Sequence, residues 1–281
     1  MSPPPPKKLQ VALAQTDVIL TRLSKLVSTP SGIDISLHTI AYTLTFLHAR
    51  LSSIFTRRLE SFALELTKNA QDTLLPGETL IATVPAPPHT ARIARLMDSS
   101  KSLASLISDF RIFFRLWGLL GIYSWGKSTY LAGPKDSLIK VLIWTQVISN
   151  VFYQILENGA YLSSKGVLKW DKAKETQWWL WSSRFWAAHV ALDFGRLGRT
   201  WWLQQQEKIA TEGDDGEKKL KVRNTENEIW WREAVVNAAY APLTLHWSLE
   251  QGVVSEAWVG FLGMVTGIIG LKEQWKTTAT N

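Results

Sequence analysis

The stretch LASLISDFRIFFRLWGLLGIYSW, residues 103–125, divides this sequence into two parts of different composition. All fifteen tryptophans lie at or after Trp117, where apolar runs are edged by Trp and Tyr, as is typical of helices that meet a bilayer interface. The part before residue 103 has helical segments separated by polar and proline-rich stretches. No residue from Leu116 to Gly126 is charged, but Arg111 and Arg115 stand just upstream. We therefore interpret residues 103–125 as a helix that enters the membrane without forming a full span of its own.

This boundary predicts two regions. Residues 1–102 are expected to form a cytosolic amphipathic-helical region with a proline-rich tail and a loop, and residues 103–281 a membrane-embedded helical region. Within the second region, residues 204–228 are dense in charges of both signs, which predicts a solvated, disordered loop. The expected fold class is all-α, a membrane-associated helical protein with an N-terminal amphipathic helix and Trp-edged apolar helices in its C-terminal two-thirds.

The composition argues against several function classes. The chain has no cysteine, so it has no disulfide and no thiolate metal site. Its formal net charge of +7 is spread along the chain without a zinc-finger, RRM or helix-turn-helix signature, so an anionic membrane surface explains the charge better than nucleic acid does. No secretory signal or transit peptide is visible at the N-terminus, which predicts synthesis in the cytosol followed by insertion.

An amphipathic helix is expected from Asp34, which is the expected N-cap, to Lys68. Nine apolar residues recur there at intervals of three and four and form one helical stripe, and polar residues such as His38 and His48 are assigned to the opposite face. The candidate membrane-binding residues are Leu44, Leu47, Leu51, Phe55, Arg57, Arg58, Leu59 and Phe62. Two interpretations of the stripe remain open at this point, namely packing inside a helical bundle and insertion into a bilayer surface, which the arginines favour slightly.

Two further apolar runs, at residues 141–156 and 257–271, are short for a bilayer span, so the sequence does not fix the number of spans. The second run contains Gly263 and Gly267 in a small-xxx-small arrangement, which allows another helix to approach closely. We take these glycines as candidate helix-packing residues and predict a homo-oligomer that forms through them.

No catalytic or metal-binding motif is found. The five histidines never occur at a zinc-ligand spacing, and the sequence has no GxSxG, Walker or strand-borne GxGxxG motif, which predicts no enzyme, no cofactor and no metal. Asp193 lies among apolar residues between two tryptophan clusters. It is either a buried proton carrier or the structural partner of Arg184 or Arg196, and the structural pair is the expected role.

Several short segments carry a family resemblance. They are LENGAYL at 156–162, KGV at 165–167, SSRFW at 182–186, NAA at 237–239 and PLTLHWS at 242–248. SGID at 31–34, Tyr42 and the glycine-rich run that ends at Gln274-Trp275 extend the similarity. On these residues the chain resembles the peroxin-eleven family of peroxisomal membrane proteins, over roughly residues 32–275 and most strongly after Phe110. It is most similar to the divergent fungal branch.

The resemblance implies a peroxisomal membrane protein with both termini in the cytosol. Such a protein elongates the peroxisomal membrane during proliferation and fission, self-associates, and acts with dynamin-type fission machinery. Its expected partners are therefore membrane lipids, further copies of itself and fission proteins, with no nucleic acid. Two rival functions stay open: a channel for small metabolites in the same membrane, and a scaffold that recruits the fission machinery through its loops.

Overall fold

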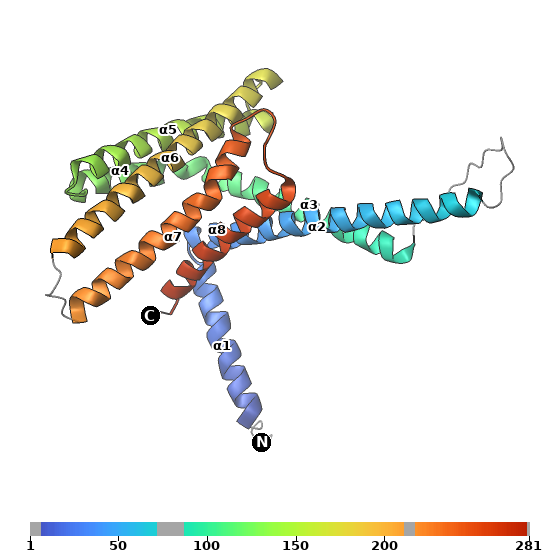
Figure 1. Cartoon of the computed structure of the whole chain (residues 1–281), viewed down its shortest axis with the longest axis horizontal. Helices are drawn as coiled ribbons and strands as arrows, with labels where there is room; N and C mark the ends of the chain where they lie inside the picture. Colours follow the sequence, from blue (N-terminus) through green and yellow to red (C-terminus); the bar gives the residue numbers. More distant parts are fainter. Residues whose placement is uncertain (1–6, 72–86, 211–216, 280–281) are drawn as a thin grey trace.

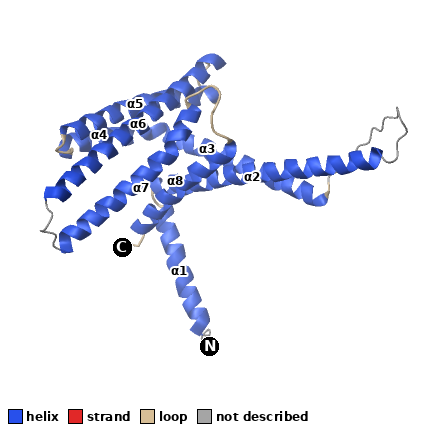
Figure 2. Cartoon of the chain, in the orientation of Figure 1, coloured by secondary structure: helices blue, strands red, loops and turns tan. Residues whose placement is uncertain are grey.

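The computed structural model describes residues 7–71, 87–210 and 217–279, and throughout these ranges the chain forms helices and connecting turns without strands (Figure 2). The prediction of an all-α fold is confirmed. α1 (Lys7–Val27), α2 (Pro30–Gln71) and α3 (Pro88–Phe114) come first. The short 3-10 helix η1 (Arg115–Trp117) leads into α4 (Gly118–Ala132), α5 (Ser137–Ser164), α6 (Lys172–Ala210), α7 (Glu217–Trp247) and α8 (Glu256–Thr277).

Helices α5 to α8 form the main body, in which α5 packs on α4 and α6, α6 on α7, and α7 on α8 (Figure 1). Helix α8 packs along α2, and this contact joins the N-terminal part to the body. Within the N-terminal part, α2 pairs with α3. The distal part of this pair, residues 52–71 of α2 and 88–96 of α3, projects away from the body (Figure 1). We call it the arm. Its described ranges contain five Lys or Arg residues and two Glu residues, so the arm has a net positive charge.

Local sequence explains where the helices of the body begin and end. The carboxylate of Asp136 caps α5 by accepting a hydrogen bond from the backbone N–H of Ile139 at 2.9 Å. Helix α5 ends before Gly166, whose φ of 75° is a left-handed conformation that glycine adopts without strain. Helix α3 begins at Pro88, where a missing N–H costs nothing.

Two sequence-based boundaries were wrong. Residues 103–125 do not form a single helix, because the chain changes direction at η1, where Arg115 turns to pair with Glu157 of α5. The disordered loop predicted for residues 204–228 was wrong at both ends, because α6 continues to Ala210 and α7 begins at Glu217. Lys, Glu and Gln are good helix formers, so a charged segment that extends a packed helix remains helical. Residues 211–216 lie outside the described residues.

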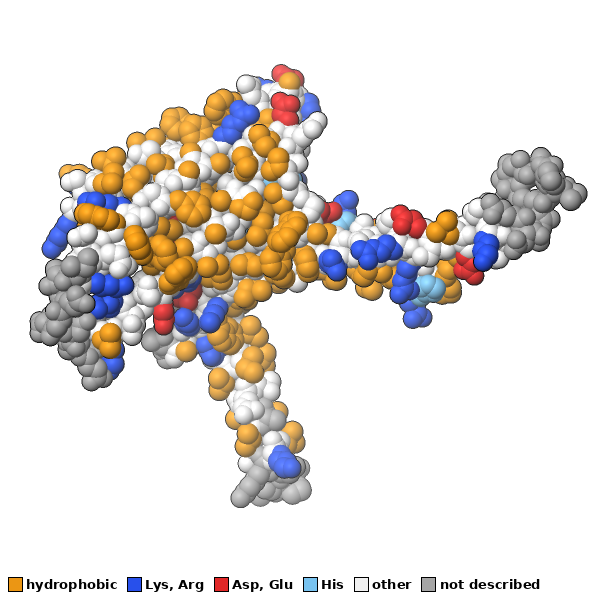
Figure 3. Space-filling view, viewed as in Figure 1, with side chains coloured by type: hydrophobic (Ala, Val, Ile, Leu, Met, Phe, Trp, Pro, Cys, Tyr) orange, Lys and Arg blue, Asp and Glu red, His pale blue; other side chains and the backbone are white. Residues whose placement is uncertain are grey.

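Hydrophobic and polar side chains are distributed in the reverse of the usual soluble pattern. Among the described residues, eighteen polar or charged residues are buried against eleven hydrophobic ones, while 47 large hydrophobic side chains are exposed. In Figure 3 hydrophobic side chains gather over the body and along α1, and several Lys and Arg side chains lie on the arm. An aqueous protein hides its apolar side chains, so this distribution fits a body whose surface contacts lipid.

Among the described helices, α5 alone is long and apolar enough to cross a membrane, by length and composition. It contains the predicted run 141–156. The other run, 257–271, lies in α8, which is long enough but does not contain an equally apolar stretch. Only 22% of the apolar window of α5 is buried in the chain, and the exposed side of this helix is free to contact lipid.

Candidate membrane-contact surface and polar interior

The apolar stripe of α2 is only partly covered by the rest of the chain. Leu47 and Leu59 are exposed, with 43% and 36% of their surface accessible. The other four apolar members, Leu44, Leu51, Phe55 and Phe62, are half-buried, and the cations Arg57 and Arg58 are exposed. Helix α3 lies along α2 and accounts for the partial cover. The stripe is therefore not the packed core of the bundle, and it remains available to an apolar partner.

The opposite side of α2 packs against α8. A Cβ at Gly263 would overlap the Tyr42 ring, a Cβ at Gly260 would overlap the Phe46 backbone, and a Cβ at Gly267 would lie 2.8 Å from Oγ1 of Thr39. The small-residue face of α8 is thus filled by α2 of the same chain. Self-association through Gly263 and Gly267 would have to displace this contact, so a homo-oligomer remains a prediction that needs another surface.

His38 and His48 are buried, contrary to the expectation that they lie on a solvated face. Nε2 of His38 lies 3.0 Å from the carbonyl oxygen of Gly263 and 3.0 Å from Oγ1 of Thr266, so His38 joins α2 to α8. Burial, assisted by the Arg111 guanidinium, lowers the pKa of His38 to about 4. Hydrophobic periodicity could not predict this burial, because it depends on two other helices that pack on α2: α8 covers His38, and α3 covers His48.

A buried ion pair joins η1 to α5. The guanidinium of Arg115 donates two hydrogen bonds to the Glu157 carboxylate, at 2.8 and 3.0 Å, and the Tyr153 hydroxyl donates a third at 2.8 Å. Glu157 is only 5% exposed. A parallel pair, between Arg111 and Asp34 at 2.8 Å, joins α3 to α2. Arg111 and Arg115, which stand just upstream of the uncharged run 116–126, are therefore each neutralised by a carboxylate, as low-dielectric surroundings require.

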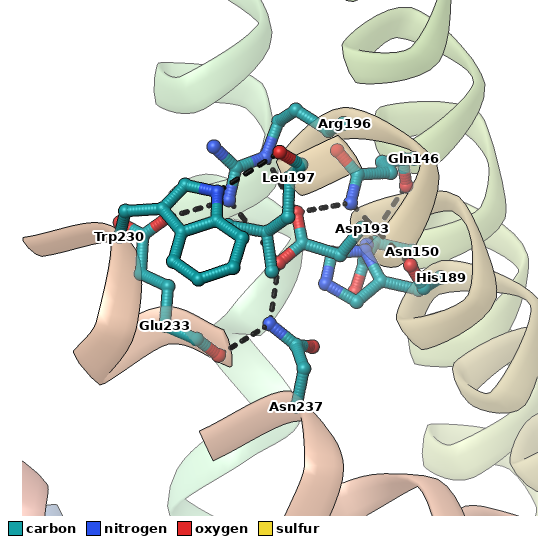
Figure 4. Close-up of polar contacts among 9 residues, drawn as sticks. All are labelled: Gln146, Asn150, His189, Asp193, Arg196, Leu197, Trp230, Glu233 and Asn237. Carbon is teal, nitrogen blue, oxygen red and sulfur yellow. Dashed lines mark hydrogen bonds and ion pairs between the residues drawn. The ribbon is translucent and has the colours of Figure 1, made fainter. Parts of the chain in front are cut away.

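A second polar cluster connects α5, α6 and α7 around Asp193 (Figure 4). The Asp193 carboxylate accepts hydrogen bonds from Arg196 at 2.6 Å, from Gln146 at 2.9 Å and from Asn237 at 2.6 Å. Arg196 also donates to Glu233 at 2.7 Å. This arrangement confirms the expected structural pair with Arg196. The Asp193 carboxylate accepts four hydrogen bonds in all, counting a second one from Arg196 at 3.2 Å, and these hold it as an ionised structural group.

A cavity of about 620 Å³ lies between these clusters. Its lining includes His38, Arg111, Arg115, Glu157 and several aromatic side chains. Arg111 is paired with Asp34 and Arg115 with Glu157, so the positive charges of the lining are balanced by carboxylates. Among the described residues, no group of three or more His, Cys, Asp or Glu residues is placed to hold a metal ion.

Comparison with known proteins decides the family. The sequence model of the family described as peroxisomal biogenesis factor 11 (PEX11) matches residues 89–275, about two-thirds of the chain. The chain belongs to the PEX11 family. It is also 31% identical over 175 residues to an uncharacterized protein of Schizosaccharomyces pombe, an alignment that covers 61% of this chain and 75% of that protein. No solved structure matches the chain.

PEX11 membership makes this chain a peroxisomal membrane protein involved in peroxisome proliferation. PEX11 is a family of biogenesis factors and is not a known enzyme family. The matched residues begin in α3 and end in α8, so they include the Arg115–Glu157 pair and the Asp193 cluster. Helices α1 and α2 precede the PEX11 match.

Proposed function

We propose that this chain remodels and elongates the peroxisomal membrane by inserting the apolar stripe of α2 into the cytosolic leaflet. The observation that carries this proposal is the accessibility of the stripe in a fold that packs the other side of the same helix against α8. If the stripe faces lipid, the exposure of Leu47 and Leu59 in the isolated chain is explained, because lipid covers them in the membrane.

The energetics support a surface-bound helix. Complete burial of a large apolar side chain contributes roughly 1.5 to 3 kcal/mol, so the six apolar members would contribute about 10 kcal/mol if all were fully exposed beforehand. Because α3 already covers part of the stripe, we take about half of this value. The arginines of the arm add about 1 kcal/mol each where they lie near anionic headgroups. Many copies inserted into one leaflet expand it relative to the other and bend the membrane.

The proposal includes the partners that elongation needs. The chain self-associates in the membrane through a surface other than the glycine face of α8, both termini lie in the cytosol, and dynamin-type machinery acts on the elongated membrane. These points extend the family assignment and are tested separately, by crosslinking in membranes and by protease protection of tagged termini.

Reconstitution of the full-length protein into vesicles that contain phosphatidylserine tests the proposal. Wild-type protein should convert spherical vesicles into tubules visible by electron microscopy. Leu47→Asp with Leu59→Asp places two charges on the stripe and should abolish tubules. The matched control, Thr56→Asp with Ser61→Asp, makes the same change in net charge at exposed positions off the stripe and should retain them. Equal tubulation by both variants would refute insertion of the stripe.

The cavity supports a second candidate, a channel for small metabolites. Charged and polar groups line it inside a lipid-facing body, as in a solute pathway. Single-channel conductance in planar bilayers separates the two functions. A conductance that Arg115→Ala alters, with no tubulation by the wild type, would favour the channel.

A further inference from the structure

Helix α1 stands apart from the rest of the molecule (Figure 1). Its contacts to other helices are made at its base, to α2 and α8. There Leu26 is buried, and Arg22 donates hydrogen bonds to the carbonyl oxygen of Trp275 at 2.6 Å and to Oγ1 of Thr278 at 3.0 Å. The Arg22 guanidinium also lies 4.2 Å from the centre of the Trp275 ring. The last turn of α8 therefore holds the base of α1 in place.

Helix α1 has an apolar face that stays exposed along its whole length. Leu9, Leu13, Leu20, Leu23 and Val27 fall within about 80° of the helix circumference, at about 100° per residue. Each of these five side chains is exposed, by 42% to 59%. Asp17, Thr21 and Ser24 lie on another side of the helix. Figure 3 shows hydrophobic side chains along the projecting α1. Most of the stability of a protein helix comes from packing of its amphipathic face, so α1 gains stability when this face is covered.

The net charge of α1 indicates which kind of partner covers its apolar face. Residues 7–27 contain four basic residues and one acidic residue, a net charge of +3 that complements an anionic surface. The body exposes many apolar side chains, as expected of a surface that contacts lipid. Because α1 is attached to this body, α1 lies close to a bilayer when the protein is in its membrane. A second protein would need a complementary acidic groove, whereas anionic lipid supplies both the apolar and the negative component.

We propose that α1 is a second lipid-binding helix, which lies in the headgroup region of an anionic bilayer with its leucine face toward the acyl chains. Arg22 is its positioning residue, because it fixes the base of α1 to α8 and thereby the direction in which α1 leaves the body. This inference rests on the proposed membrane-remodelling function, to which α1 adds a second inserted element in the same leaflet. The α1 helix lies outside the segment that matches the PEX11 family.

Single labels on the full-length protein test this proposal directly, because the chain has no native cysteine. A polarity-sensitive fluorophore is attached at Leu20→Cys or, as the matched control, at Thr21→Cys, and the protein is reconstituted in phosphatidylcholine–phosphatidylserine vesicles. The label at position 20 should shift to the blue and be quenched severalfold more by nitroxide-bearing lipids than the label at 21. Equal quenching at both positions would overturn the proposal. A blue shift without lipid quenching would assign the face to protein and overturn it too.

A third label, at Leu47→Cys on the α2 stripe, separates this inference from the proposed function. Quenching at 47 but not at 20 refutes the role of α1 alone, and quenching at 20 but not at 47 refutes insertion of α2 alone. The positioning role of Arg22 is tested with spin labels at Thr21→Cys and Lys272→Cys. Arg22→Gln should broaden the distance distribution between α1 and α8, whereas Lys8→Gln should leave it unchanged. The same narrow distribution in both variants would overturn the positioning role of Arg22.

Discussion

The crossing of α2 and α8 depends on glycines, and their replacement by alanine gives a measurable loss of stability. A Cβ at Gly267 would lie 2.9 Å from the Cα of Thr39, and backbone atoms cannot move aside as a flexible side chain can. At Gly263 the Cβ would overlap the Tyr42 ring, which lies tilted against the His38 ring with ring centres 4.6 Å apart. Overpacking typically costs 1–3 kcal/mol. Alanine recovers about 1 kcal/mol of helix propensity, so the net loss is up to about 2 kcal/mol.

Gly198 in α6 supplies the matched control. A Cβ there would have no neighbour within 4 Å, so Gly198→Ala gains helix propensity without a clash and should stabilise the protein by up to about 1 kcal/mol. Thermal unfolding in detergent, followed by circular dichroism, should show lower midpoints for Gly263→Ala and Gly267→Ala, by several degrees at about 2–4 °C per kcal/mol. An unchanged midpoint for both, combined with loss of oligomers, would show that the glycines act between copies and would refute the intramolecular crossing.

Three further variants test the polar interior. Arg115→Ala leaves the buried Glu157 carboxylate without its cation and should cost about 3–5 kcal/mol in chemical unfolding, most of which Glu157→Gln in the same chain should restore. Between pH 6.5 and 4 the unfolded state binds more protons at His38 than the folded state, so stability should be complete above pH 6.5 and fall by up to about 1.4 kcal/mol per pH unit below it. A His38→Gln variant that kept the full slope would exclude this origin. Asp193→Asn should cost about 1–3 kcal/mol, and an unchanged unfolding curve would contradict a structural role for the cluster.

Hydrophobic periodicity predicted much of the fold. The 3-and-4 spacing of leucines placed the long α2 helix within a few residues, although its start at Pro30 precedes the expected cap at Asp34. The tryptophan distribution predicted membrane contact only from Trp117 onward, whereas exposed apolar side chains also occur earlier, on α1 and α2. Both signals are local, because they depend only on which residues share one helical face. Asp34 was mistaken for a cap because its true partner, Arg111, is remote in sequence.

The polar interior was predicted only in part. The pairing of Asp193 with Arg196 follows from a spacing of one helical turn and was expected. Gln146 and Asn237, which complete the cluster, come from neighbouring helices more than forty residues away along the chain. No local pattern distinguishes such amides from exposed ones. Likewise, the break at η1 depends on Glu157 of α5, so a reading of residues 103–125 alone could not find it.

The central claim is that lipid covers the α2 stripe, and a spin-label scan from residue 47 to residue 59 of the full-length protein in anionic vesicles tests it most directly. Each position is changed in turn to cysteine and labelled, and its accessibility to oxygen in the lipid phase is compared with its accessibility to a water-soluble relaxant. We predict a periodic profile of about 3.6 residues, with lipid maxima at Leu47, Leu51, Phe55 and Leu59 and water maxima at Arg50 and Arg57. A profile without this period, or with the stripe positions open to water, would contradict it.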